Sequence, residues 1–154
     1  MENIKSVDRY LNTQTRIGIV AARTDNAATI SNHFEALRHT NPKNGLNLYL
    51  AEAEALRETN HYQEALDNLG KALSSHPNDQ NLLYVRVLIS ERLNLLDILE
   101  KDLLTIIAID PKNGEALNTL GYTLANRTNR YQEALDYIQK AMLLLPNDAA
   151  VRYD

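Results

Sequence analysis

All four prolines of this 154-residue chain stand in short segments of the same kind, and they recur at an almost constant spacing. They are Pro42 in NPKN, Pro77 in HPND, Pro111 in DPKN and Pro146 in LPND, at intervals of 35, 34 and 35 residues. Proline cannot continue a helix, and it pushes the residue before it out of the helical region. The Asn or Asp that follows can cap a new helix by accepting a hydrogen bond from one of its first N–H groups. Each segment therefore predicts the end of one helix and the start of the next, in a helical repeat array.

A second helix breaker lies near the middle of each unit. These breakers are Thr24-Asp25-Asn26, Thr59-Asn60-His61, Leu93-Asn94-Leu95 and Thr128-Asn129-Arg130. Apolar residues between the breakers fall at helical intervals, and no alternating β pattern of useful length occurs. We therefore expect each unit to fold as two helices joined by a tight turn, in an all-α protein.

Aligning the units shows where side chains must be small. With the proline counted as position 32, and with one inserted turn residue allowed in the fourth unit, three positions are small in the second and fourth units but partly larger in the first and third. Position 8 holds Gly18, Ala53, Val87 and Gly121; position 20 holds Ile30, Ala65, Leu99 and Ala134; position 27 holds Leu37, Ala72, Ile106 and Ala141. Small residues there let two antiparallel helices approach closely, so the helices of the first and third units must lie further apart or pack differently.

These features resemble the tetratricopeptide repeat (TPR) family, most closely in HYQEAL…KAL…HP and RYQEAL…KAM…LP. The resemblance implies a right-handed α-solenoid of four TPR-like helix-turn-helix repeats. Its expected parts are a lead-in segment (1–10), a degenerate repeat 1 (11–45), repeat 2 (46–79), a degenerate repeat 3 (80–113), repeat 4 (114–148) and the start of a truncated next helix (149–154).

Composition and motifs argue against several classes of function. A net charge of −4 does not suit a general nucleic-acid binder, which needs a basic face. The chain has no cysteine, its four histidines lack metal-binding spacing, and no glycine-rich phosphate loop or catalytic triad occurs. No apolar run approaches the roughly 18 to 20 residues that span a bilayer. We expect no enzyme, no cofactor, no metal and no membrane insertion by this segment.

We expect two groups of polar residues, the histidines and a set of glutamates, to have no functional role. The histidines His33, His39, His61 and His76 are expected to be solvent-exposed or at helix ends. Glu52, Glu54 and Glu58 look like a carboxylate cluster, but Glu54 and Glu58 share a helix face beside Arg57. A solvated charged face is the expected explanation.

In the TPR architecture, the first helix of each pair lines a concave groove. The resemblance therefore implies a binding surface for a protein or peptide, made of Asn12, Thr15, Ile19, Arg23, Asn47, Leu50, Glu54, Arg57, Asn81, Tyr84, Leu88, Glu91, Asn118, Tyr122 and Asn126. Tyr84 and Tyr122 are the expected anchors, since each offers a large apolar area and a polar tip. Two alternatives remain open here: helix capping explains Asn12, Asn47 and Asn81, and packing explains the tyrosines.

One TPR subfamily clamps the C-terminal carboxylate of a chaperone with Lys and Asn at two groove positions, and with Lys and Arg two repeats later. The matching positions here are Thr15 and Ile19, then Tyr84 and Leu88. The clamp residues are absent, so that acidic peptide class is not the expected ligand.

A narrower resemblance concerns residues 82–103 and 116–138, which are similar to TPR lipoproteins of Gram-negative bacteria. This implies an internal fragment of a longer protein on the periplasmic face of the outer membrane, although composition fits the cytoplasm equally. Some such proteins are adaptors that hold a periplasmic carboxyl-terminal processing protease near its substrates, which makes that protease or its substrates the implied partner.

Two apolar surfaces suggest further contacts. The stripe from Leu95 to Ile109 is wider than one core face needs; either the loose packing of this degenerate repeat absorbs it, or part of it is exposed and contacts a partner or a second copy. Met142–Leu145 would meet a following repeat. We expect self-association through uncapped ends. The rival functions are a structural spacer within a longer array and an accessory domain of a larger protein.

Overall fold

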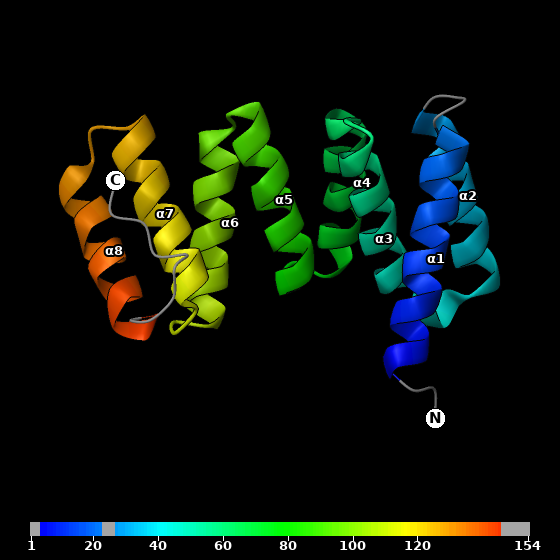
Figure 1. Cartoon of the computed structure of the whole chain (residues 1–154), viewed down its shortest axis with the longest axis horizontal. Coiled ribbons are helices and arrows are strands. Elements are labelled where there is room, and N and C mark those ends of the chain that lie inside the picture. Colours follow the sequence, from blue (N-terminus) through cyan, green and yellow to red (C-terminus); the bar gives the residue numbers. More distant parts are fainter. Residues whose placement is uncertain (1–3, 23–26, 146–154) are drawn as a thin grey trace. The chain divides into compact units, whose positions relative to one another are not determined.

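The computed structural model describes residues 4–22 and 27–145, and these residues form helices without any strand (Figure 1). The prediction of an all-α fold is confirmed. The elements are α1 (Ile4–Ala22), α2 (Ala27–Thr40), the short 3₁₀-helix η1 (Pro42–Asn44), α3 (Gly45–Glu58), α4 (Tyr62–Ser75), α5 (Gln80–Leu93), α6 (Leu96–Ile109), α7 (Gly114–Arg127) and α8 (Tyr131–Leu144).

The residues after the prolines cap two helices as predicted. Asp79 accepts a hydrogen bond from the backbone N–H of Leu82 at 2.9 Å, at the start of α5. Asn113 does the same for Ala116 at 3.0 Å, at the start of α7. The prediction is wrong at Asn44, whose side chain forms no capping bond because η1 leads directly into α3. Pro146 lies outside the described residues.

Asparagine makes two of the turns within the repeats. Asn60 and Asn94 have φ values of 63° and 59°, in the left-handed region that asparagine tolerates better than most residues. The hydroxyl of Tyr62 donates to Oδ1 of Asn60 at 2.8 Å, which ties the start of α4 to its turn. The predicted breaker at residues 24–26 lies outside the described residues.

The chain divides into two compact units, residues 1–94 and 95–154. In the first unit, α3 packs against α1, α2, α4 and α5. Its fully buried large side chains are Ile30, Phe34, Leu48, Leu56, Leu69, Leu82, Val87 and Ile89. The helix α1 begins at Ile4, inside the segment predicted as a lead-in.

In the second unit, α7 packs against both α6 and α8. Leu99, Leu103 and Ile106 of α6 are buried, whereas Leu104 and Ile109 are each 41% exposed. The wide apolar stripe of this helix is therefore only partly buried in the core. On α8, Leu143 is 83% exposed.

The close helix approach expected at position 8 occurs between α7 and α8. A Cβ atom on Gly121 would lie 2.9 Å from the backbone oxygen of Ala134. In the first unit, a Cβ atom on Gly18 would instead lie 3.1 Å from the ring of Phe34. An aromatic side chain therefore fills the space between α1 and α2, which is the different packing predicted for the degenerate first repeat.

Candidate functional site

The helix α5 places six of its 14 residues in the core. Leu82, Leu83, Val85, Val87, Ile89 and Ser90 are all buried. Among the groove positions of this helix, Asn81 is exposed, and Tyr84, Leu88 and Glu91 are half-buried. These four residues recur at intervals of three and four, so they share one face of the helix. The open side of α5 is therefore largely the side assigned to the groove.

The neighbouring helix α3 has the same organisation. Asn47 is exposed and Leu50 is half-buried, while Leu48, Ala51 and Ala55 are in the core. The two charged groove residues are half-buried and form an ion pair, because Nε and Nη2 of Arg57 donate to Oε2 of Glu54 at 3.1 and 2.7 Å. This surface of α3 therefore offers amide and apolar groups with its charges already balanced.

The helix α1 contributes fewer described groove residues. Asn12 is exposed, and the hydroxyl of Thr15 donates to the backbone oxygen of Leu11 at 2.8 Å. Arg23 and the side chain of Ile19 lie outside the described residues. Arg16 forms an exposed ion pair with Glu58 of α3 at 3.4 Å, which joins α1 and α3.

The second unit holds three predicted groove residues, all on α7. Tyr122 is half-buried and Asn126 is exposed, whereas Asn118 is only 7% exposed. Asn118 is therefore poorly placed to contact a partner.

Helix capping does not explain the groove asparagines. The residue at the N-cap of α3 is Asn44 and that of α5 is Asp79, whereas Asn47 and Asn81 lie inside the first turn of these helices. Asn12 lies in the middle of α1.

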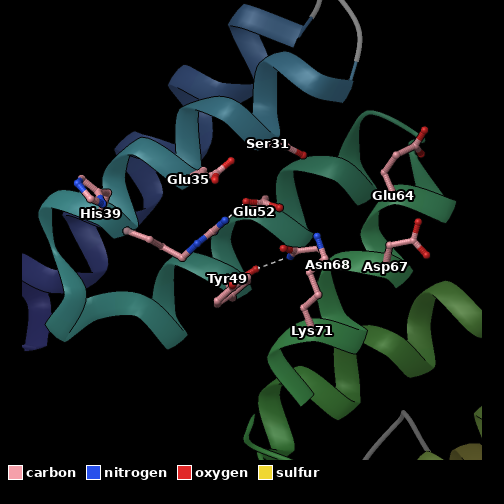
Figure 2. A pocket seen from close by; sticks show the side chains of 10 residues that line it. Ser31, Glu35, His39, Tyr49, Glu52, Glu64, Asp67, Asn68 and Lys71 are labelled. Atoms are coloured by element: carbon pink, nitrogen blue, oxygen red, sulfur yellow. Dashed lines mark hydrogen bonds and ion pairs between the residues drawn. The ribbon is translucent and has the colours of Figure 1, made fainter. Parts of the chain in front are cut away.

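A buried ion pair that the sequence did not predict joins α2 and α3 (Figure 2). Glu52 was expected on a solvated face, and that expectation is wrong, because it is only 3% exposed. Its Oε1 accepts a hydrogen bond from Nη1 of Arg38 at 2.8 Å. The guanidinium of Arg38 also lies 3.9 Å from the centre of the Tyr49 ring, a cation–π contact. Arg38 and Tyr49 carried no sequence signal for this contact, because a buried pair between neighbouring helices has no fixed spacing along the chain.

Burial raises the pKa of Glu52 above 4.5, and Arg38 offsets this effect only in part. When a carboxyl has a higher pKa in the folded than in the unfolded state, its ionisation favours the unfolded state. The protein therefore loses stability as the pH rises through the folded pKa. We expect the free energy of unfolding of the natural chain, relative to Glu52→Gln, to decrease as the pH rises above 4.5. Urea unfolding at a series of pH values measures this difference, and an increase with pH would contradict the assignment.

His33 also differs from expectation. Its Nε2 atom is buried and has no hydrogen-bond partner among the described residues, and its ring packs edge-on against Phe34 with the ring centres 5.1 Å apart. The expectation of an exposed or helix-end histidine is wrong here, because the side chain packs in the interface between α1 and α2 near Gly18.

In residues 4–22 and 27–145, no group of three or more histidine or acidic side chains is arranged to hold a metal ion. Within those ranges no helix is both long and apolar enough to cross a bilayer.

Comparisons with known proteins agree with the repeat architecture. A tetratricopeptide repeat model matches residues 103–136. The chain is 43% identical over 138 residues to the TPR repeat-containing protein PA4667 of Pseudomonas aeruginosa, a match that covers 90% of this chain and 23% of that protein. The chain therefore spans about a quarter of the length of this curated relative.

Solved structures share the fold at low sequence identity. A tetratricopeptide repeat protein from Parabacteroides merdae aligns with a TM-score of 0.74 and 17% identity, over 93% of this chain and 56% of that one. The first TPR domain of Spaghetti (RPAP3), bound to the HSP90 peptide SRMEEVD, aligns with a TM-score of 0.62 and 19% identity, over 69% and 83% of the two chains. The repeat-spaced prolines, the paired helices and these matches together place the chain in the tetratricopeptide repeat family.

Proposed function

We propose that this chain is a protein- or peptide-binding scaffold that uses the groove side of its first helices. The observation that carries the proposal is the open side of α5. This helix buries six of its residues, yet it leaves Tyr84 and Leu88 half-buried one turn apart, with Asn81 and Glu91 on the same face. These side chains are therefore at least partly accessible to a partner.

Rigid helices suit such a role. Their side chains are already ordered by the core behind them, so a partner would bind with little loss of conformational freedom on the scaffold side. Tyrosine adds apolar contact area together with a hydroxyl group. TPR proteins typically act as scaffolds rather than as enzymes, and we assign this chain a binding role.

The class of ligand is expected to differ from that of the peptide-bound structural neighbour. That neighbour holds an HSP90 peptide with an acidic end. By family resemblance, the positions that would clamp such an end hold Thr15, Ile19, Tyr84 and Leu88 here. These residues supply no cation, so we propose a ligand with apolar and amide groups.

We further propose an adaptor role in the bacterial envelope. The support is the resemblance of residues 82–103 and 116–138 to TPR lipoproteins, some of which hold a periplasmic protease near its substrates. The relative from Pseudomonas aeruginosa agrees with a bacterial setting. The candidate partner is such a protease or one of its substrates.

Binding is expected to depend on the two predicted anchors. The immobilised chain and a Tyr84→Ala/Tyr122→Ala variant would each be exposed to envelope and cytosolic extracts, and the affinity of any captured protein would then be measured after purification. Loss of both tyrosines should weaken binding by at least tenfold, since truncation of a central aromatic anchor often costs about 2 kcal/mol or more.

The matched control is Tyr131→Ala, which removes an equally large side chain that is 62% exposed at the start of α8, outside the groove positions. Circular dichroism would verify that every variant is folded. Equal capture by all variants would place the binding surface elsewhere. Capture of nothing by the natural chain would favour the structural spacer.

A further inference from the structure

A cavity of about 570 Å³ lies within the first unit, away from the groove side of α3. Side chains of α2 and α4 form its walls, and Tyr49 and Glu52 of α3 lie between them (Figure 2). The groove positions of α3, Asn47, Leu50 and Glu54, lie on the opposite side of the helix, because a residue advances about 100° around the axis. The volume is within the range of ligand-binding pockets. This cavity is therefore a second, separate candidate site.

Two buried side chains present unused acceptor atoms to this cavity. Glu52 is 3% exposed, and its only hydrogen bond within the described part of the chain joins Oε1 to Arg38. Asn68 is 6% exposed, and its Nδ2 donates to the backbone oxygen of Tyr49 at 3.0 Å. The second carboxyl oxygen of Glu52 and Oδ1 of Asn68 accept no hydrogen bond from any residue that the structure describes. Neither oxygen is sealed in the core, because the fully buried polar atoms without a partner in the described residues are His33 Nε2 and Ser90 Oγ. Both oxygens can therefore accept hydrogen bonds from a ligand in the cavity.

The charges around the cavity favour a positive ligand. Its lining contains four carboxylates, those of Glu35, Glu52, Glu64 and Asp67, but only Arg38 and Lys71 as permanent cations. Arg38 is already engaged by Glu52 and by the Tyr49 ring. Glu35 and Glu64 form no ion pair or hydrogen bond with the residues that the structure describes. Lys71 acts on Glu52 through space without a direct ion pair.

We propose that this cavity binds the charged end of a lysine or arginine side chain presented by a protein partner. The ammonium or guanidinium group would donate to Glu52 and Asn68, while Glu35 and Glu64 balance its charge. A cavity of this volume exceeds what one charged side chain fills, so neighbouring parts of the partner would enter as well. The Arg38 guanidinium already covers the Tyr49 ring, so recognition depends on acceptors and charge rather than on aromatic stacking.

The test uses a short peptide with both ends blocked, in which a single lysine stands between glycine and serine residues. The peptide would be titrated into the isotopically labelled chain, and the backbone amide signals of α2, α3 and α4 would be followed by NMR. We expect a dissociation constant on the order of 1 mM for this minimal probe, weakened by added salt. The same peptide with an acetylated lysine keeps the shape and loses the charge, and it should bind at least tenfold more weakly. Equal binding of both peptides would overturn the proposal.

Three variants locate the site. Glu35→Gln/Glu64→Gln removes the two unpaired wall carboxylates and should weaken lysine peptide binding by about tenfold. The control Asp97→Asn/Asp136→Asn makes the same change in net charge with exposed residues of the second unit, and it should have less than a twofold effect. Lys71→Met removes a competing cation and should strengthen binding. Weakening by the control equal to that of the wall variant would overturn the proposal.

Free polyamines share the chemistry of the ligand, so spermidine would be titrated in parallel. Spermidine binding more tightly than the lysine peptide would overturn the assignment to a protein partner. The groove variant Tyr84→Ala/Tyr122→Ala should bind the lysine peptide normally. The outcome is therefore independent of the function proposed for the groove.

Discussion

Replacing Gly121 by alanine is expected to lower the free energy of unfolding by about 2 to 3 kcal/mol. The added Cβ atom would lie 2.6 Å from Cγ1 of Ile138, 2.9 Å from the backbone oxygen of Ala134 and 3.1 Å from the backbone nitrogen of Ile138. The isoleucine side chain can rotate away from the first contact. The other two contacts involve the backbone of α8, so relief requires α7 and α8 to move apart and to loosen the core between them.

Urea unfolding followed by circular dichroism measures the loss. The matched control is Gly70→Ala in α4, where an added Cβ atom has no neighbour within 4 Å. That substitution should raise the free energy of unfolding by about 0.5 to 1 kcal/mol, because alanine favours a helix more than glycine does. A Gly121→Ala variant as stable as the natural chain would show that the two helices separate at little cost.

Replacing Phe34 by alanine is expected to cost about 3 to 5 kcal/mol, the range typical of a buried aromatic residue. Phe34 is completely buried in the first unit, against Gly18 of α1 and beside the His33 ring. Its removal leaves a cavity between α1 and α2. The exposed residue Ile17 of α1 supplies a control, since Ile17→Ala should change stability by less than about 1 kcal/mol.

A second substitution tests the mechanism of this loss. The ring of Phe34 lies 3.1 Å from the position of a Cβ atom on Gly18. With the ring removed, Gly18→Ala should recover part of the lost stability, whereas in the natural chain it crowds the ring. The double variant Gly18→Ala/Phe34→Ala is therefore expected to be more stable than Phe34→Ala alone. Equal or lower stability would show that the space between the helices had already closed.

The sequence predicted the helix boundaries well because proline and asparagine act locally. The breakers around Asn60 and Asn94 mark turns in the structure, and Asp79 and Asn113 cap the helices that follow them. At Asn44 the same tetrapeptide behaves differently because an extra 3₁₀ turn forms. Local residue types therefore predict where a helix stops more reliably than how the next one starts.

The burial and pairing of polar side chains were harder to predict from the sequence. The groove positions of α5 came from the resemblance to the TPR family, and in the structure Asn81 is exposed while Tyr84, Leu88 and Glu91 are half-buried. The burial of Glu52 could not be predicted in this way. Its position beside Glu54 on a polar-looking helix suggests solvent exposure, and its partner Arg38 comes from the last turn of another helix. Such pairs depend on how helices meet in three dimensions, and a repeat pattern does not encode their side-chain chemistry.

The burial pattern of α5 has a consequence for how this protein can diversify. Six of the 14 side chains of the helix are buried in the core, so substitutions of these six are expected to be removed by selection for folding. Asn81, Tyr84 and Leu88 lie on the remaining side, where side chains are exposed or half-buried, so a change alters the surface more than the interior. Related chains could therefore acquire different partners through a few substitutions along one edge of a single helix, at little cost to the stability of the repeat.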